Sequence, residues 1–215
     1  MKKIGILFDL DGTLLDTLGD LTDSVNYTLR HYGLPERTPS QIRSYLGNGA
    51  RQLLELACDG KGDIDEMLAF YQSYYKTHCQ IKTAPYPYIP EVLENLGKQY
   101  VLAVVSNKPD AATKRLCADI FPGIFARGEA LDCPRKPAPD MLLKTKEELG
   151  LDRFLYVGDS DVDVVTAHNA GVPCISVLWG FRDREDIEAA GGRYFCTDAR
   201  ELPATIEKIL GEQNG

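Results

Sequence analysis

The sequence predicts an α/β fold: a doubly wound, Rossmann-like parallel sheet with an α-helical bundle inserted near its start as a cap. Two patterns support this prediction. Short apolar runs that end in polar residues alternate with helix-like segments through most of the chain, which is typical of a parallel sheet. Directly after the first run comes a long stretch of helical patterns without any strand-like run.

Four apolar runs are expected to form buried strands of the sheet. They are Ile4–Phe8, Tyr100–Val105, Phe154–Val157 and Cys174–Leu178. Helical patterns of suitable length lie after the first of these runs and between the later ones, including 108–119, 138–149 and 160–170. In open α/β sheets ligands bind at the carboxyl ends of the strands, and in this chain polar residues follow each of these ends.

The cap is expected at residues 17–82, and the core domain at 1–16 and 83–215. Helical patterns in the cap cover Leu18–His31, Pro39–Leu46, Ala50–Cys58 and Ile64–Thr77. Thr38 supplies a capping hydroxyl before a proline that suits the first helical position. Tyrosines 71, 74 and 75, at helical spacing, are expected to pack inside the cap. The stretch is too long for a simple crossover between two strands, so it is predicted to be a second domain.

Composition and charge narrow the possible partners. The 215 residues include 24 Lys and Arg against 32 Asp and Glu, so the formal charge is 24 − 32 = −8. A net-negative protein is not attracted to nucleic acid or to an anionic membrane, so neither is expected as a partner. Six scattered cysteines without a Cys-x-x-Cys pair predict reduced thiols in a cytoplasmic protein, either a monomer or a homodimer.

The first polar cluster is Asp9-Leu10-Asp11-Gly12-Thr13, directly after the first strand. Two carboxylates that close repel each other, and a hard cation such as Mg²⁺ would remove that difficulty. Gly12 lets the backbone bend so that amide groups face a phosphate. A carboxylate that attacks phosphorus gives an aspartyl-phosphate intermediate. An Asx turn that caps the following helix explains the same five residues equally well.

Three further clusters follow later strands. Asp159 and Asp163 come after the third run; taken alone, they fit a helix cap with acidic first-turn residues better than a metal site. Ser106 and Asn107 end the second run, where they can hold phosphate oxygens or simply form a turn. Lys136 precedes a helix and is expected to neutralise the carboxylates, with a surface charge as its alternative and Arg135 as a competing candidate.

The convergence of the clusters carries more weight than any one of them. Each falls at the carboxyl end of a predicted strand, so one pocket would gather several carboxylates, a lysine and phosphate donors. Phosphoryl transfer depends on such positioning and charge neutralisation. The sequence therefore predicts a site that acts on a small phosphorylated metabolite.

These residues resemble the motifs of the haloacid dehalogenase superfamily of phosphatases, in order and over nearly the whole chain. Asp9 to Thr13 resemble its first motif, Ser106 its second, Lys136 its third, and Asp159 with Asp163 its fourth. The resemblance implies that Asp9 is the nucleophile and Asp11 the general acid and then the general base. It implies that Mg²⁺ is held by Asp9, the Asp11 carbonyl and Asp159, with Asp163 as an outer partner. Leu10, Gly12, Thr13, Ser106 and Asn107 would bind the phosphate.

Within the superfamily, the cap segment Leu46–Arg51 and the Pro85-Tyr86-Pro87 connector resemble the phosphoglycolate phosphatase group, so 2-phosphoglycolate is the expected substrate. Asn48, Gly49 and Arg51 would contact its carboxylate; a plain turn between helices explains the segment equally well. The chain departs from the group at Tyr88, where glycine is usual.

Other functions are compatible with parts of the pattern. Relatives in the same group act on pyrophosphate or nucleoside monophosphates, and a β-phosphoglucomutase shares both aspartates of the first motif. A phosphoacceptor signalling domain also gathers Asp, Ser or Thr and Lys at a sheet edge, but it has no inserted cap and does not need Asp11. A binding protein without catalysis is disfavoured because every expected site residue is present.

Overall fold

The computed structural model describes residues 2–212. Its core is a six-stranded sheet in the order β5-β4-β1-β6-β7-β8, in which all neighbours pair in parallel. The strands are β1 (Ile4–Phe8), β4 (Val101–Pro109), β5 (Phe125–Glu129), β6 (Arg153–Gly158), β7 (Cys174–Val177) and β8 (Tyr194–Cys196). The predicted fold class is confirmed.

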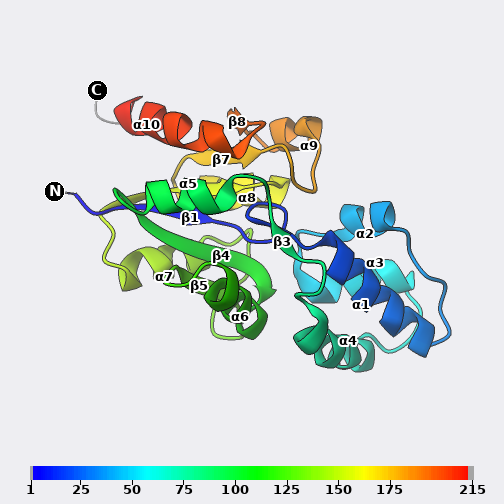
Figure 1. Cartoon of the computed structure of the whole chain (residues 1–215). Coiled ribbons are helices and arrows are strands. Elements are labelled where there is room, and N and C mark those ends of the chain that lie inside the picture. Colours follow the sequence, from blue (N-terminus) through cyan, green and yellow to red (C-terminus); the bar gives the residue numbers. More distant parts are fainter. Residues whose placement is uncertain (1, 213–215) are drawn as a thin grey trace.

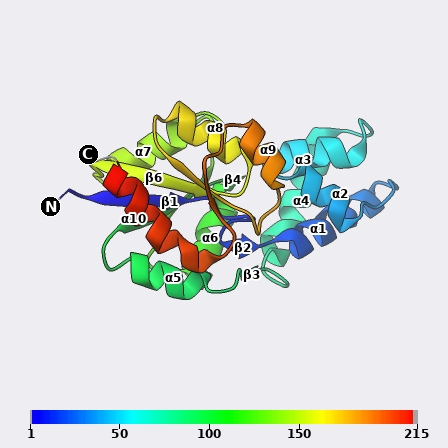
Figure 2. The same cartoon turned by 90° about the horizontal axis from the view of Figure 1, so that it is seen from above.

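Helices cover both faces of the sheet (Figure 2). Those on one face are α5 (Ile89–Leu96), α6 (Asp110–Ile120) and α10 (Leu202–Glu212), and those on the other are α7 (Asp140–Glu148) and α8 (Asp161–Asn169). Side chains of the central strand β1 pack into both layers, because successive side chains of a strand point to opposite faces. Ile6 and Phe8 pack into the first layer and Leu7 into the second, all three fully buried.

Four helices between the first and second strands of this sheet form a bundle beside its carboxyl edge (Figure 1). They are α1 (Leu18–His31), α2 (Pro39–Tyr45), α3 (Gly49–Cys58) and α4 (Ile64–His78). The predicted start of α2 is confirmed: the Gln41 amide donates to the Thr38 hydroxyl at 3.3 Å, and the Thr38 amide donates back to the Gln41 side chain at 2.9 Å. We refer to this bundle as the cap.

Two connectors join the cap to the core, and they are paired with each other. β2 (Leu15–Asp16) runs antiparallel to β3 (Ala84–Pro85). The buried Asp20 carboxylate, in the first turn of α1, accepts the backbone amides of three consecutive residues, 81 to 83, at 2.9 to 3.0 Å. Because one side chain holds three amides of the return connector, both connectors are tied into one unit.

The sequence did not predict several outer elements. The edge strands β5 and β8 are missing from the prediction, as are helices α5, α10 and α9 (Arg184–Ala189). β5 lacks a continuous apolar run because it contains Arg127, Gly128 and Glu129, and the apolar run of β8 is only three residues long. β4 also runs on to Pro109, past the predicted start of the next helix.

Two chemical expectations concern the chain as a whole. All six cysteines are free, and five of them are buried, as expected for reduced core thiols. Within residues 2–212, no helix combines the length and apolar character that a bilayer crossing requires.

Tyr88 occupies a backbone conformation that normally belongs to glycine. Its φ is +65°, in the left-handed region, where it forms the N-cap of α5. This geometry favours glycine, because a side chain in this region costs about 1–2 kcal/mol. The Tyr88 ring is half exposed and packs under the Arg200 guanidinium, 4.1 Å from the ring centroid, which offsets part of that cost.

This strain predicts an inverted order of stability for two substitutions. Tyr88→Gly and Tyr88→Ala both remove the ring, and we expect the glycine variant to be more stable by about 1 kcal/mol in urea unfolding. At the exposed helical position Leu143 the order should be the usual one, with alanine more stable by about 1 kcal/mol. An alanine variant that matches or exceeds the glycine variant at Tyr88 would contradict the strain.

Candidate active site

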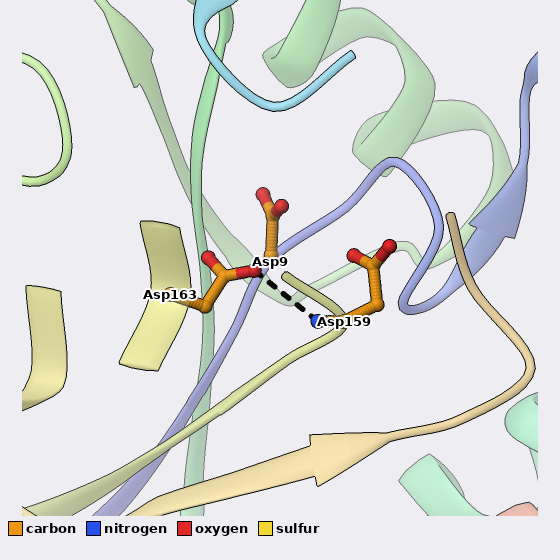
Figure 3. Close-up of side chains that lie close together, drawn as sticks. All are labelled: Asp9, Asp159 and Asp163. Atoms are coloured by element: carbon orange, nitrogen blue, oxygen red, sulfur yellow. Dashed lines mark hydrogen bonds between the residues drawn. The ribbon is translucent and has the colours of Figure 1, made fainter. Parts of the chain in front are cut away.

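The candidate site lies where the strand order reverses. From β1 the chain adds β4 and β5 on one side, and then β6, β7 and β8 on the other. The carboxyl end of β1 is therefore flanked by those of β4 and β6, and such a switch point opens a crevice in α/β sheets. Figure 3 shows the three carboxylates that meet here: Asp9 after β1, Asp159 after β6, and Asp163 in the first turn of α8.

The Asp9 carboxylate sits in a buried and polar setting. Burial raises the pKa of Asp9 to about 6; Lys136 opposes this shift, and the negative charge of Asp163 adds to it. Its Oδ1 lies 3.0 Å from the Lys136 ammonium, but it accepts no hydrogen bond of good geometry from the described residues. The carboxylate thus has one cation beside it and room for a further positive charge.

Lys136 is the cation beside Asp9 and Asp163, and it is almost fully buried. Its ammonium contacts Asp163 Oδ1 at 2.7 Å and the Tyr156 hydroxyl at 3.0 Å. Burial alone would lower the pKa of Lys136, but the charges of Asp163 and Asp9 outweigh it and raise the pKa. The competing candidate Arg135 is partly exposed and lies 3.8 Å from Glu129, away from the carboxylates.

Asp163 has both of its oxygens engaged by protein donors. Oδ1 faces Lys136, and Oδ2 accepts the Ser160 hydroxyl at 2.7 Å and the amides of residues 159 and 160. Ser160 in turn caps α8. Asp163 is therefore both a capping residue of α8 and a member of the site. Its hydrogen bonds hold the loop that carries Asp159.

Asp159 is fixed by donors from two other loops. The Thr13 hydroxyl donates to Oδ1 at 3.0 Å, and the Phe181 amide donates to Oδ2 at 2.7 Å. Burial, followed by the charges of Asp163 and Asp9, raises the pKa of Asp159 well above its usual range. Gly12, at φ +83°, passes so close that a Cβ there would lie 2.3 Å from Asp159 Oδ2.

This donor set fits a divalent cation. Asp9, Asp159 and Asp163 each offer a carboxylate oxygen within 4.8 Å of the others, and all three are buried. Three buried carboxylates face one lysine, so the cluster carries excess negative charge that a cation would relieve. Since both Asp163 oxygens are already engaged, the side chains best placed to bind an ion are Asp9 and Asp159.

Asp11 points toward the cap and is held by a residue that the sequence interpretation missed. The Lys108 ammonium lies 2.9 and 3.1 Å from its two oxygens. The available signal was the period of two along a strand, which puts Lys108 on the same face as Ser106. It was missed because Ser-Asn-Lys-Pro was interpreted as a turn and a helix start, whereas β4 continues through it.

A cavity of about 60 Å³ lies between core and cap. On the core side it is lined by Asp9, Asp11, Ser106, Lys108 and Asp159. The cap contributes mainly apolar and aromatic side chains: Leu21, Leu53, Tyr71 and Tyr75. Tyr71 and Tyr75 are buried in the cap, as expected, and they also line this cavity. An enclosure this small suits a small leaving group.

The remaining predicted site residues fall in different places. Gly49 lines the cavity, and Asn107 joins core to cap by donating to the Gly47 carbonyl at 3.0 Å. Arg51 instead pairs with Asp65 and Glu55 on the cap, with its side chain 45% exposed. Asn48 is the N-cap residue of α3 and makes no side-chain cap bond. The Leu10 side chain is fully buried in the core, which leaves only its backbone for a ligand.

Two arginines join cap and core in a reciprocal way. Arg43, on α2, donates to the backbone carbonyls of Phe181 at 2.9 Å and Gly180 at 3.1 Å. Arg182, in the loop after β7, donates to the carbonyls of Arg43 and Leu46. The Phe181 amide is also the donor to Asp159, so this contact adjoins the carboxylate cluster.

Comparisons with known proteins agree with this geometry. The chain matches the haloacid dehalogenase-like hydrolase family over residues 6–177. It is 37% identical to the phosphoglycolate phosphatase of Aquifex aeolicus, covering 82% of this chain and 85% of the relative. It is 31% identical to the N-acetylmuramic acid 6-phosphate phosphatase of Pseudomonas aeruginosa, covering 98% and 97%. A solved candidate phosphoglycolate phosphatase of Lactobacillus delbrueckii superposes with a TM-score of 0.84 at 35% identity, over 94% of this chain and 97% of that one.

The chain belongs to the haloacid dehalogenase-like hydrolase family. The predicted resemblance and the predicted class of enzyme, a phosphoric monoester hydrolase, are both confirmed.

The buried lysine leads to a prediction about stability. Lys136→Met would leave Asp9 and Asp163 buried without their counter-charge, and we expect the free energy of unfolding to fall by about 3–5 kcal/mol. Magnesium should restore part of this loss because it replaces positive charge at the same carboxylates. Urea unfolding with and without magnesium measures both effects. The exposed Lys144→Met is the matched control, and an equally small loss at Lys136 would contradict the assigned role.

Proposed function

We propose that this enzyme hydrolyses a small phosphate monoester, with 2-phosphoglycolate as the best candidate, through an aspartyl-phosphate on Asp9. The observation that carries the proposal is the placement of Asp9: it lies beside Asp159 and Lys136 in the wall of a small cavity that Asp11 also lines. Nucleophile, charge-neutralising groups and a proton donor thus surround one space where a phosphoryl group fits.

The reaction follows from the roles of the two aspartates. An Asp9 carboxylate oxygen attacks phosphorus, and the bond from phosphorus to the ester oxygen breaks. Asp11 gives its proton to the leaving oxygen, which departs as the alcohol. Asp11 then takes a proton from a water molecule that attacks the phosphorus, the bond to Asp9 breaks, and inorganic phosphate leaves. The cap excludes bulk water until the alcohol has gone.

The proposal includes a magnesium ion. Asp9, Asp159 and the Asp11 carbonyl would hold it, and it would neutralise charge on the phosphoryl oxygens. The three carboxylates within 4.8 Å of one another, two of them with raised pKa, support this assignment. Asp163 would steady these ligands, and Lys136 would balance the charge that remains.

The choice of substrate rests on the cavity and on the relatives. The cavity suits a compact leaving group, and several curated relatives are named phosphoglycolate phosphatases. One relative is named for a larger ester, N-acetylmuramic acid 6-phosphate, and we propose that the cap sets the choice of substrate. A sugar-phosphate mutase would need space for its substrate in two orientations. The free thiols support a cytoplasmic location.

The role of Asp9 can be tested by one substitution. Asp9→Asn keeps the shape but removes the nucleophile, so we expect phosphate release from 2-phosphoglycolate to fall by about 10⁴-fold or more. Circular dichroism should show an intact fold. Asp119→Asn, at a partly exposed aspartate on α6, is the matched control and should retain full activity. Substantial turnover by Asp9→Asn would rule out the nucleophile.

The raised pKa of Asp9 predicts a pH-dependent affinity for magnesium. With a pKa of about 6 in the folded protein, against 3.8 as the reference, Asp9 holds a proton below pH 6. A proton competes with the ion, so the affinity should fall as the pH drops through 6, by up to about tenfold per pH unit for the one proton on Asp9. Titration calorimetry between pH 5 and 8 measures this dependence.

The raised pKa of Asp9 also determines the direction in which the stability of the folded protein changes with pH. A carboxyl whose pKa is raised on folding stabilises the metal-free protein below pH 4, and this contribution is lost as the pH rises through 6. Magnesium should therefore raise the melting temperature more at pH 8 than at pH 5. An effect of magnesium that is independent of pH would contradict the assignment of Asp9 as a ligand.

A further inference from the structure

Lys108 is a buried cation for which the proposed reaction gives no role. It is 5% exposed and lies between core and cap. Its three ammonium protons are all directed at neighbours: the two Asp11 oxygens at 2.9 and 3.1 Å and the Tyr75 hydroxyl at 2.5 Å. Burying an ammonium is costly, so a charge retained here calls for an acidic partner.

Asp11 is that partner in this structure, but the reaction needs Asp11 elsewhere. A general acid must turn an oxygen toward the leaving group, and here both oxygens of Asp11 face Lys108. If a negative charge on the leaving group contacts Lys108, it replaces at least one of these contacts. Asp11 is then free to turn to the ester oxygen, while the ammonium keeps an acidic partner throughout.

No other cation that lines the described cavity is available for this role. Arg182 is engaged with the carbonyls of Arg43 and Leu46 and with Asp161. Lys136 lies below the cavity, between Asp9 and Asp163. An anionic leaving group in this space would therefore meet Lys108.

The cap adds a second polar group to the same place. Tyr75, from α4, accepts a hydrogen bond from Lys108, so its own hydroxyl proton is free to be donated. Burial raises the pKa of Tyr75 well above its usual range, which keeps that proton in place. The neighbouring Leu21, Leu53 and Tyr71 are mostly or wholly buried and largely apolar, and an ion pair is stronger in such surroundings.

We propose that Lys108 and Tyr75 form a subsite for a negatively charged group on the leaving alcohol. The enzyme then selects phosphate monoesters that carry a carboxylate, or another anion, near the ester oxygen. The spacer must be short, because the Lys108 ammonium lies within 3.1 Å of the carboxylate that protonates the ester oxygen. Since Tyr75 belongs to the cap, the subsite is complete only when the cap covers the core.

The inference rests on the proposed function, and two esters of similar size test it. 2-Phosphoglycolate carries a carboxylate where 2-hydroxyethyl phosphate carries a neutral alcohol. We expect Lys108→Met to lower kcat/KM for the first ester by roughly 10- to 100-fold more than for the second, which is the effect of one lost charged contact. Tyr75→Phe should shift the ratio in the same direction by a smaller factor. Lys144→Met, at a partly exposed lysine, should leave the ratio unchanged.

Binding separates failure of the subsite from failure of the enzymatic function. On an Asp9→Asn background, affinities for the two esters should show the same Lys108-dependent ratio without turnover. An equal loss of affinity for both esters would mean that Lys108 only positions Asp11, and no loss of affinity would remove Lys108 from the site. Either result overturns the inference. If the wild-type protein cleaves neither ester but keeps the Lys108-dependent ratio in binding, the proposed reaction fails and the subsite stands.

Discussion

The active site depends on one buried ion pair network, in which the Lys136 ammonium lies between Asp9 and Asp163. Without it, three carboxylates would share a buried space, and repulsion would keep them protonated. With it, the pKa of Asp9 is about 6, so the charged form that the proposed nucleophile needs is within reach. The same network anchors Asp163, which holds the loop that presents Asp159. One side chain thus sets both the charge and the geometry of the cluster.

The chemistry is divided between two parts of the chain. The core supplies the carboxylates from the ends of its strands and the start of α8, and Lys136 from the loop that precedes α7. The cap supplies the apolar walls and the Tyr75 hydroxyl, which decide what can occupy the space beside Asp11. Relatives of this chain are named for different phosphate esters, phosphoglycolate and N-acetylmuramic acid 6-phosphate. Selectivity can change in the cap while the reacting groups stay fixed.

Much of the core site was predictable because its residues follow strands, and parallel strands bring their carboxyl ends together. Asp9, Asp159 and Lys136 were found in this way, and they meet in the structure. Lys108 was not found, since its role depends on β4 extending three residues beyond Ser106 and on a hydroxyl from a distant helix. Arg51 was assigned to the site from its position in a turn, but the turn does not fix where a long side chain points. The edge strands were missed because charged residues interrupt the apolar pattern of β5 and because β8 is only three residues long.

Arg43 of the cap and Arg182 of the core each donate hydrogen bonds to the backbone of the other part. Arg43 and Arg182 donate to four backbone carbonyls, and a carbonyl is the same whichever residue carries it. Phe181 and Leu46 can therefore vary without loss of the contact, whereas Gly180 has no room for a side chain beside Asp159. The surfaces of cap and core can change around these bonds while the two parts stay joined in the same position, provided the two guanidinium groups persist.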